Sequence, residues 1–305
     1  MKSERICIIV NPFSQGGRTR FNYPSYLNNL KNNGLIFDTY HTKTKKHSTD
    51  IVKKYLNDYD TFIAIGGDGL LHEIAQVLVK HKDKTLGIAP SGNGNMFASH
   101  HWIYNIHDAI SSIKKNKKRE IDLVKIKFKS DEKTKTVYSH CIFGLGYISD
   151  VVRLAVNSFR IFGPKFCYPM SGFLGSMYLD KYKTKLVFDD KKYTIDKLNT
   201  IIFLNHGRVG PFKIVENSSD RDGKIEYVIY KNTGRIEAAL CVLEAALRTQ
   251  NFTRNKTVGQ AKKIKIKLPS KKELMIDGEM YGCTDLIEAE VIHKSLTVLT
   301  NKKRK

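Results

Sequence analysis

Three glycine-containing segments carry the residue types that could hold a phosphate group. They begin at Asn11-Pro12, at Gly66-Gly67-Asp68-Gly69, and at Pro90, where the pattern is Pro-x-Gly-x-Gly-Asn. Glycine lets backbone N–H groups approach an anion closely, and a helix N-terminus aims such groups at it. One segment of this kind is usually a simple turn, but three in one chain favour a ligand that bears phosphate.

Each of these segments lies next to a short apolar run that predicts a buried strand. The runs cover residues 6–10, 61–65 and 86–89, and apolar residues with helical spacing follow at 70–79 and 106–113. The alternation of strand, loop and helix predicts an α/β domain with a parallel sheet. Because the carboxyl ends of parallel strands meet at one edge of a sheet, we expect the glycine segments to lie together there.

The pattern changes near Ile121. From there apolar and polar residues alternate, at 124–128, 225–230, 263–268 and 286–291. Such alternation is typical of antiparallel strands with one face in water. We therefore expect the fold class α/β plus β, in which a C-terminal antiparallel β-sandwich-like domain is interrupted by helical patches at about 151–179 and 236–247.

The charge of the chain limits its partners. Its 305 residues include 52 Lys+Arg and 30 Asp+Glu, a net charge of +22. A field of this size favours nucleic acid, an acidic membrane surface or phosphorylated small molecules, unless it only keeps the protein in solution. The sequence contains no cluster of arginine and aromatic residues of the kind that favours nucleic-acid binding. No apolar run approaches the ~20 residues of a membrane span, and the cysteines form no Cys-x-x-Cys pair, so we expect a cytoplasmic protein.

The glycine segments do not fit the common nucleotide-binding motifs, since there is no Walker P-loop and no Gly-x-Gly-x-x-Gly that opens a helix. Together with later marks they resemble the diacylglycerol kinase catalytic domain and its lipid-kinase relatives. The continuation Leu70-Leu71-His72-Glu73 is most similar to sphingosine kinases. The later marks are Phe143-Gly144-Leu145-Gly146-Tyr147, which leads to Asp150, and Asp277-Gly278-Glu279.

This resemblance implies a kinase that uses ATP and Mg²⁺ to phosphorylate a lipid hydroxyl. It implies that ATP binds to an α/β domain at residues 1–122 and the lipid to a β-rich domain at 123–292. The last stretch, about 293–305, is expected to return to the first domain. The resemblance assigns no direct metal ligand.

Asp68 matches the family's proposed general base, which takes the proton of the lipid hydroxyl as the γ-phosphate arrives. General-base help of this kind contributes roughly 10²- to 10⁴-fold to a rate. The alternative for Asp68 is a cap for the helix that begins at Leu70. The resemblance also places Gly66, Gly67 and Gly69 beside the substrate.

The resemblance implies nucleotide contacts in several parts of the chain. Glu73 could instead be an exposed helix residue, and Asp277-Gly278 is also a common hairpin-turn pair. Gln15 departs from the more glycine-rich first segment of many family members. The implied nucleotide-binding residues are Asn11, Pro12, Phe13, Thr42, Lys43, Thr44, Lys45, Lys46, Gly67, Gly69, Glu73, Gly92, Asn93, Gly94, Arg160, Lys165, Asp277, Gly278 and Glu279.

Asp150 matches the acidic residue with which sphingosine kinases hold the amine of their lipid. Diacylglycerol has no cationic amine that could pair with this carboxylate. The alternative for Asp150 is an N-cap before Val151. Many apolar residues follow between 159 and 179, and they could form either core or the walls of a pocket for an alkyl chain.

The sequence therefore predicts an ATP-dependent sphingosine kinase. Its substrate would be a sphingosine-like long-chain base, collected by reversible peripheral contact with an anionic membrane surface. The nearest alternative is a kinase for diacylglycerol or another lipid of the same superfamily. More distant alternatives are an NAD kinase and a non-catalytic basic protein that binds membranes or nucleic acid.

Overall fold

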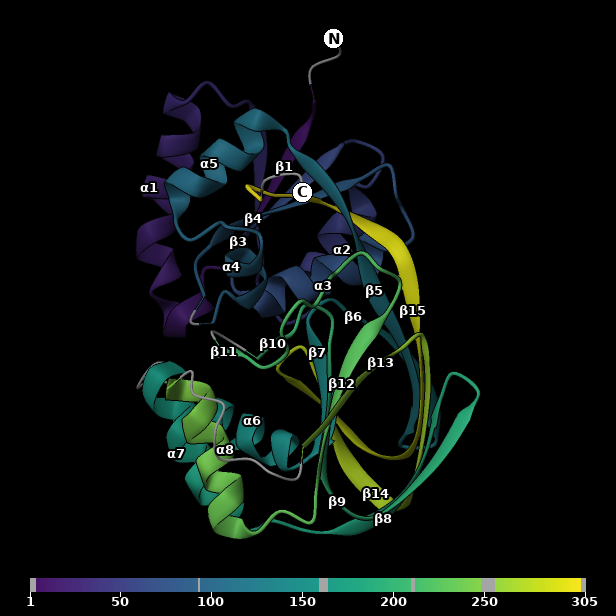
Figure 1. Ribbon diagram of the computed structural model, residues 1–305. Coiled ribbons are helices and arrows are strands. Elements are labelled where there is room, and N and C mark those ends of the chain that lie inside the picture. Colours follow the sequence, from purple (N-terminus) through teal and green to yellow (C-terminus); the bar gives the residue numbers. More distant parts are fainter. Residues whose placement is uncertain (1–3, 93, 159–163, 210–211, 248–255, 303–305) are drawn as a thin grey trace. The chain divides into compact units, whose positions relative to one another are not determined.

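The computed structural model describes residues 4–92, 94–158, 164–209, 212–247 and 256–302. The chain divides into two compact units, of which the first contains Met1–Leu123 and His293–Lys305 and the second Val124–Ile292. The divisions fall within or at two long strands, β5 (Lys118–Ser130) and β15 (Glu279–Leu299), so both strands supply residues to each unit (Figure 1).

The first unit is built on a parallel sheet with the strand order β15-β4-β3-β1-β2. β1 (Ile6–Val10), β3 (Thr61–Gly66) and β4 (Thr85–Pro90) are buried along their whole length. This burial explains their continuous apolar runs, because a central parallel strand is covered on both faces. β2 (Phe37–His41) ends the order and is only partly buried.

Helices connect these strands and place the glycine segments at the carboxyl ends of β1, β3 and β4. The helix α3 (Asp68–Leu78) begins just after β3 and buries Leu71, Ile74 and Leu78 along one side. The remaining helices of this unit are η1 (Ser14–Gly17), α1 (Thr19–Asn32), α2 (His47–Lys54), α4 (Met96–His100) and α5 (Ile106–Lys115).

The second unit contains antiparallel strands that form one connected network rather than two packed sheets. β9 (Lys191–Leu204) pairs with β8 (Tyr182–Phe188) near one end and with β7 (Ile142–Gly146) near the other. β14 (Lys263–Ile276) also pairs with β8 near one end and with β7 near the other. The four strands therefore close into a ring, and the sandwich-like expectation is corrected to a curled sheet. Strands of this length can change partner along their course because irregularities in the register bend them.

The other strands of the second unit extend this network. β12 and β13 continue it beyond β9, whereas β5, β6 and β15 lie on the side of β14, and β10 and β11 form a separate pair. Their bounds are β6 (Lys133–Ser139), β10 (Arg208–Val209), β11 (Phe212–Lys213), β12 (Ile225–Lys231) and β13 (Lys256–Ala261).

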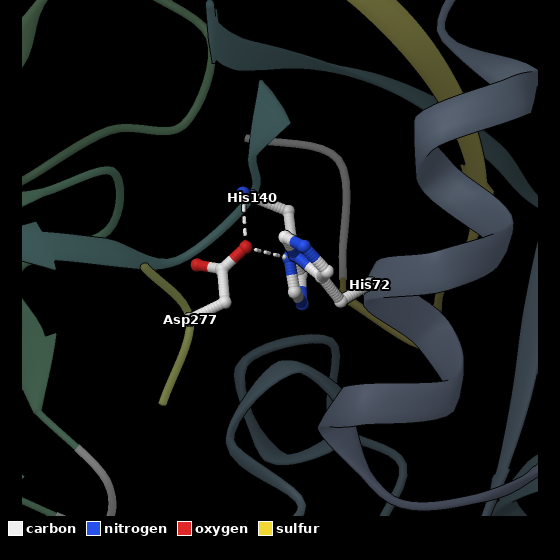
Figure 2. Close-up of side chains that lie close together, drawn as sticks. All are labelled: His72, His140 and Asp277. Carbon is white, nitrogen blue, oxygen red and sulfur yellow. Dashed lines mark hydrogen bonds and ion pairs between the residues drawn. The ribbon is translucent and has the colours of Figure 1, made fainter. Parts of the chain in front are cut away.

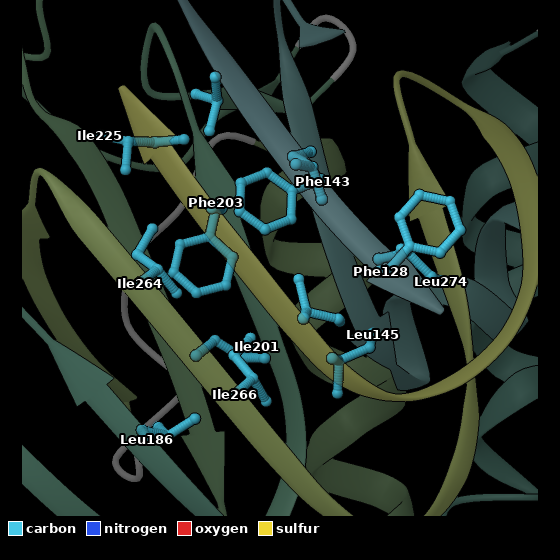
Figure 3. Packing of buried hydrophobic residues seen from close by; sticks show 14 of the residues in the cluster. Phe128, Phe143, Leu145, Leu186, Ile201, Phe203, Ile225, Ile264, Ile266 and Leu274 are labelled. Atoms are coloured by element: carbon cyan, nitrogen blue, oxygen red, sulfur yellow. The ribbon is translucent and has the colours of Figure 1, made fainter. Parts of the chain in front are cut away.

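Inward-facing side chains of the curled sheet form the core of the second unit. The rings of Phe143 and Phe203 stack with centroids 4.4 Å apart, and both residues are fully buried (Figure 3). Leu186 of β8 and Ile264 and Ile266 of β14 belong to the same buried cluster (Figure 3). The alternation that the sequence shows is thus the alternation between this core and the outer face.

Three helices of the second unit pack beside the sheet. The helix α6 (Tyr147–Asn157) follows β7 directly and packs against β9 and β14. The turn into α6 needs Gly146, because φ is +82° there and a β carbon would lie 2.3 Å from the Asn199 carbonyl oxygen. α7 (Pro164–Ser176) packs against both α6 and α8 (Arg235–Leu247).

Candidate active site

The glycine segments after β3 and β4 touch each other through their backbones. A β carbon on Gly92 would lie 2.4 Å from the Cα of Gly67, so only glycine allows this approach. The first segment joins them, because the Gln15 side-chain amide donates to the Gly92 carbonyl oxygen at 3.0 Å. The Thr19 hydroxyl lies 2.8 Å from that of Ser91. The expected gathering of the three segments at one sheet edge is therefore present in the first unit.

Asp68 is the first residue of α3, but its carboxylate caps a different helix. Its two oxygens accept the backbone N–H groups of Met96 and Phe97, each at 3.0 Å, in the first turn of α4. A β carbon on Gly94 would lie 3.0 Å from Asp68 Oδ2. The half-buried carboxylate is therefore fixed in orientation beside the joined glycine segments. The alternative role for Asp68 was to cap its own helix, and the carboxylate caps α4 instead.

The first segment is held by its own side chains. The Asn11 side-chain oxygen accepts the Phe13 N–H at 3.0 Å, and the Phe13 ring is 63% exposed. Gln15 has φ of +54°, a left-handed conformation that glycine adopts more easily. Gln15 thus adopts a backbone shape that is typical of glycine, while its side chain reaches Gly92. Pro12 beside them is half-buried.

Glu73 anchors the segment from Thr42 to Lys46. Its Oε1 accepts the Lys46 N–H at 2.8 Å, and its Oε2 accepts the Ser48 hydroxyl. Glu73 is therefore not a freely exposed helix residue, because it holds the start of α2. Thr42 is buried, and its N–H donates to the Val10 carbonyl oxygen, whereas residues 43–46 are exposed. This arrangement presents a lysine-rich turn after β2.

Asp277 and Gly278 form the turn between β14 and β15, with φ of +49° and +85°. The buried Asp277 carboxylate accepts hydrogen bonds from the Ser139 hydroxyl and from the backbone N–H groups of residues 140–142. His140 Nδ1 lies 2.6 Å from the same carboxylate (Figure 2). By accepting these hydrogen bonds, Asp277 holds the residues that lead into β7 and stabilises the fold of the second unit. Glu279 beside it is half-buried.

Asp150 lies in the first turn of α6, whose N-cap is Gly146, so Asp150 is not the N-cap of this helix. Its Oδ1 accepts a hydrogen bond from Arg153 Nη2 at 3.0 Å. Arg153 Nε also lies 3.2 Å from Glu273 Oε2. The hydrogen bond that Arg153 donates to Asp150 is the main reason that the pKa of Arg153 is raised. The carboxylate expected to hold a lipid amine thus already has a cationic partner.

A mostly apolar cavity lies between α6, α8 and β9 in the second unit. It offers a volume of about 80 Å³ to a water-sized molecule. Its walls include Val151 of α6, Ile202 of β9, and Ala238, Cys241 and Val242 of α8. The few polar groups at its edge include Asn199 and Thr233.

Of the residues between 166 and 179, which the structure describes with their side chains, few line this cavity. Tyr168 and Leu179 line it, whereas Phe173 and Met177 are exposed. In α8 the regularly spaced apolar residues Ile236, Leu240 and Leu243 are also exposed. The α8 residues that line the cavity, Ala238, Cys241 and Val242, lie on another side of that helix. Their side chains are small, and no pattern in the sequence marks them as walls of a cavity.

Three residues of the predicted nucleotide site cannot be placed. Asn93 and Arg160 lie outside the described residues, and the side chain of Lys165 does too. Among the described residues, the nucleotide contacts predicted in the first unit gather at the sheet edge after β1, β2, β3 and β4. Gly278 and Glu279 belong to the second unit.

Residues 5–126 match the family model of the diacylglycerol kinase catalytic domain. The chain is similar to a diacylglycerol kinase of Staphylococcus saprophyticus, with 25% identity over 284 residues that cover 92% of this chain and 90% of that protein. Its similarity to sphingosine kinase 2 of Homo sapiens, at 30% identity over 102 residues, covers only 31% of this chain and 16% of that protein. The match over most of the chain is thus to diacylglycerol kinases.

Solved structures share the fold. A diacylglycerol kinase from Bacillus anthracis str. Sterne superposes with a TM-score of 0.72 at 19% identity, over 99% of this chain and 98% of that chain. An NAD kinase from Archaeoglobus fulgidus, solved in complex with ATP, gives a TM-score of 0.51 at 12% identity, over 98% and 94% of the two chains. At these identities the likeness concerns the fold alone.

The contact between Gly67 and Gly92 leads to a stability prediction. Gly92→Ala should lower the free energy of unfolding by about 1–3 kcal/mol, because the added methyl group forces the two segments apart. Gly234→Ala is the matched control, since a β carbon there meets no atom within 4 Å. Chemical denaturation of both variants measures the difference. Equal stability of the two variants would mean that the close approach does not exist.

Proposed function

We propose that this protein is an ATP-dependent lipid kinase whose acceptor is diacylglycerol or a related lipid without a cationic head group. The observation that carries the proposal is the Asp68 carboxylate, fixed by the first turn of α4 beside the joined glycine segments. It lies within residues 5–126, which match the diacylglycerol kinase catalytic domain. The relative that matches over 92% of the chain carries the same name, so diacylglycerol replaces sphingosine as the proposed acceptor.

The first unit has groups suited to the triphosphate of ATP. Gly67 and Gly92 lie at the carboxyl edge of a parallel sheet, where backbone N–H groups commonly bind phosphate. The exposed Lys43 and Lys46 add positive charge after β2. Phosphoryl transfer depends mainly on alignment and charge neutralisation, to which Mg²⁺ contributes when it is bound.

Asp68 would act as the general base in this reaction. Its carboxylate would accept the proton of the lipid hydroxyl while the hydroxyl oxygen forms its bond to the γ-phosphorus. The bond from the γ-phosphorus to the bridging oxygen breaks, and ADP leaves. The hydrogen bonds from Met96 and Phe97 keep the carboxylate in one orientation, so that no reorganisation is needed.

The cavity of the second unit would hold an alkyl chain of the lipid. Its walls are apolar, and burial of each methylene yields about 0.8 kcal/mol. Tyr147 at the wall donates its hydroxyl hydrogen to carbonyl oxygens of Gly172 and Ala238, so it presents mainly its ring to the cavity. Burial raises the pKa of Tyr147, which keeps this group neutral.

Asp68→Asn tests the chemistry. We expect turnover of diacylglycerol to fall by about 10²- to 10⁴-fold, because the amide cannot accept the proton. Transfer of labelled γ-phosphate from Mg-ATP to diacylglycerol, sphingosine and ceramide in matched mixed micelles measures the loss. The control is Asp58→Asn, which removes an exposed carboxylate from the same unit.

Circular dichroism and ATP binding would establish that the Asp68→Asn protein is folded. Unchanged turnover in that folded variant would exclude Asp68 as the base. Phosphate transfer by the wild-type protein to NAD alone would favour the dinucleotide kinase, whereas lipid or nucleic-acid binding without any transfer would favour a non-catalytic binding protein.

Cys241→Trp tests the cavity. The indole ring should fill space between α6 and α8, so the KM for a long-chain diacylglycerol should rise about tenfold or more, as for two displaced methylenes. A short-chain diacylglycerol should be affected less. Cys283→Trp is the control, because Cys283 is exposed and does not line the cavity. Equal KM changes for both chain lengths would place the alkyl chain elsewhere.

We also propose that the exposed apolar side chains of α7 and α8 contact the membrane from which the lipid is taken. Phe166 and Phe173 of α7 and Ile236 and Leu240 of α8 belong to this surface. Among the described residues no helix is long and apolar enough to span a bilayer, so contact would be peripheral. The net charge of +22 would add attraction to anionic lipids.

A pair of matched variants tests the membrane surface. Ile236 is 80% exposed and Ile36, in the first unit, is 84% exposed. Ile236→Ser should weaken binding to vesicles of phosphatidylcholine and phosphatidylglycerol about tenfold, because one large apolar side chain no longer enters the bilayer. Ile36→Ser should leave it unchanged. Cosedimentation measures both, and equal effects would argue against this surface.

A further inference from the structure

Arg153 lies between two carboxylates in the second unit. Its Nη2 is 3.0 Å from Asp150 Oδ1, one helical turn earlier on α6, and its Nε is 3.2 Å from Glu273 Oε2 on β14. The three side chains are 42%, 30% and 32% exposed, respectively. One guanidinium thus bridges two carboxylates that a molecule from solution can still approach.

The backbone fixes both carboxylates near each other. Leu274, next to Glu273, pairs with Leu145 of β7, and α6 begins two residues after Leu145. The Ser149 hydroxyl also donates to the Glu273 carbonyl oxygen at 3.0 Å. The helix that carries Asp150 and the strand that carries Glu273 are therefore tied together independently of Arg153.

One of the bridged carboxylates, Asp150, lies on α6 next to residues that line the apolar cavity. Tyr147, Ile148 and Val151 line the cavity and flank Asp150 on α6. Burial raises the pKa of Tyr147 most, followed by Cys241 and then by the charge of Asp150. A lipid with its chain in the cavity would therefore have its head group within reach of this charged cluster.

We propose that Arg153 influences the choice of acceptor by pairing with Asp150 and Glu273, so that a lipid with a cationic amine gains less from these carboxylates than it would in the absence of the guanidinium. The inference rests on the proposed lipid-kinase function and names a residue that determines its specificity. An ammonium group would have to displace the guanidinium or share the carboxylates with it, and the positive charge of Arg153 offsets part of their attraction. A glycerol hydroxyl carries no charge and depends less on this balance. Arg153 here acts on selection and is not a catalytic residue.

Removal of the guanidinium should reverse this selection. Arg153→Met leaves two carboxylates without a cation, and a lipid ammonium can supply one. We expect the ratio of kcat/KM for sphingosine to that for diacylglycerol to rise about tenfold or more, the effect of one charge-assisted hydrogen bond. The double variant Asp150→Asn with Arg153→Met should lose most of this gain, because a carboxylate needed by the amine is gone.

The ratio separates selection from structure. If Arg153 only stabilises α6, its loss should lower both kcat/KM values alike, and an unchanged ratio in a folded Arg153→Met protein would overturn the proposal. Arg153→Lys should keep the wild-type preference, because it restores a cation between the carboxylates.

A binding experiment keeps this test distinct from failure of the proposed function. Binding of hexadecylamine and hexadecanol to the wild-type protein and to Arg153→Met requires no turnover. If no lipid is phosphorylated but Arg153→Met gains affinity for the amine alone, the kinase proposal fails and the charge selection stands. If both proteins bind the two probes alike, the charge selection fails whatever the kinase assay gives.

Discussion

The contact between the backbones of Gly67 and Gly92 is the constraint on which the candidate site depends. A single methyl group at either position would press against the other loop, so the ends of β3 and β4 can approach only as glycine. Because the loops meet, Asp68 after β3 can reach the first turn of α4 after β4, and Gln15 can reach the same place from β1. Buried parallel strands supply the rigid base for this contact.

Three carboxylates of this protein hold segments of the backbone in place. Asp68 holds α4, Glu73 holds the start of α2, and Asp277 holds the residues that lead into β7. In each case a side chain accepts backbone N–H groups from a segment distant in sequence, which otherwise would lack acceptors. The three residues stand out in the sequence for a structural reason, and only Asp68 combines that role with a position at the glycine segments.

Secondary structure was predicted best where the apolar residues follow the repeat of a single kind of element. The apolar runs at 6–10 and 61–65 are strands, because burial on both faces requires apolar residues in succession. α1 was not predicted, since it buries only Thr19 and Leu30 and contains Pro24, so no apolar stripe marks it. The pair Asp150 and Arg153 has helical spacing and could have been found, but Glu273 joins it through strand pairing that spacing cannot reveal. The exposed apolar side of α8 shows that regular spacing does not say what covers a helix face.

The position of β15 in the chain has a consequence for biosynthesis. This strand pairs with β14 and, through Thr297 and Val298, with β4, and Asp277 just before it supplies the acceptors for residues 139–142. While the ribosome is still translating the region before residue 277, the backbone N–H groups of residues 140–142 have no Asp277 to accept them, and one side of β4 has no partner strand. Nascent chains of this protein therefore expose an unpaired strand edge until late in translation, when pairing with another chain competes with correct folding.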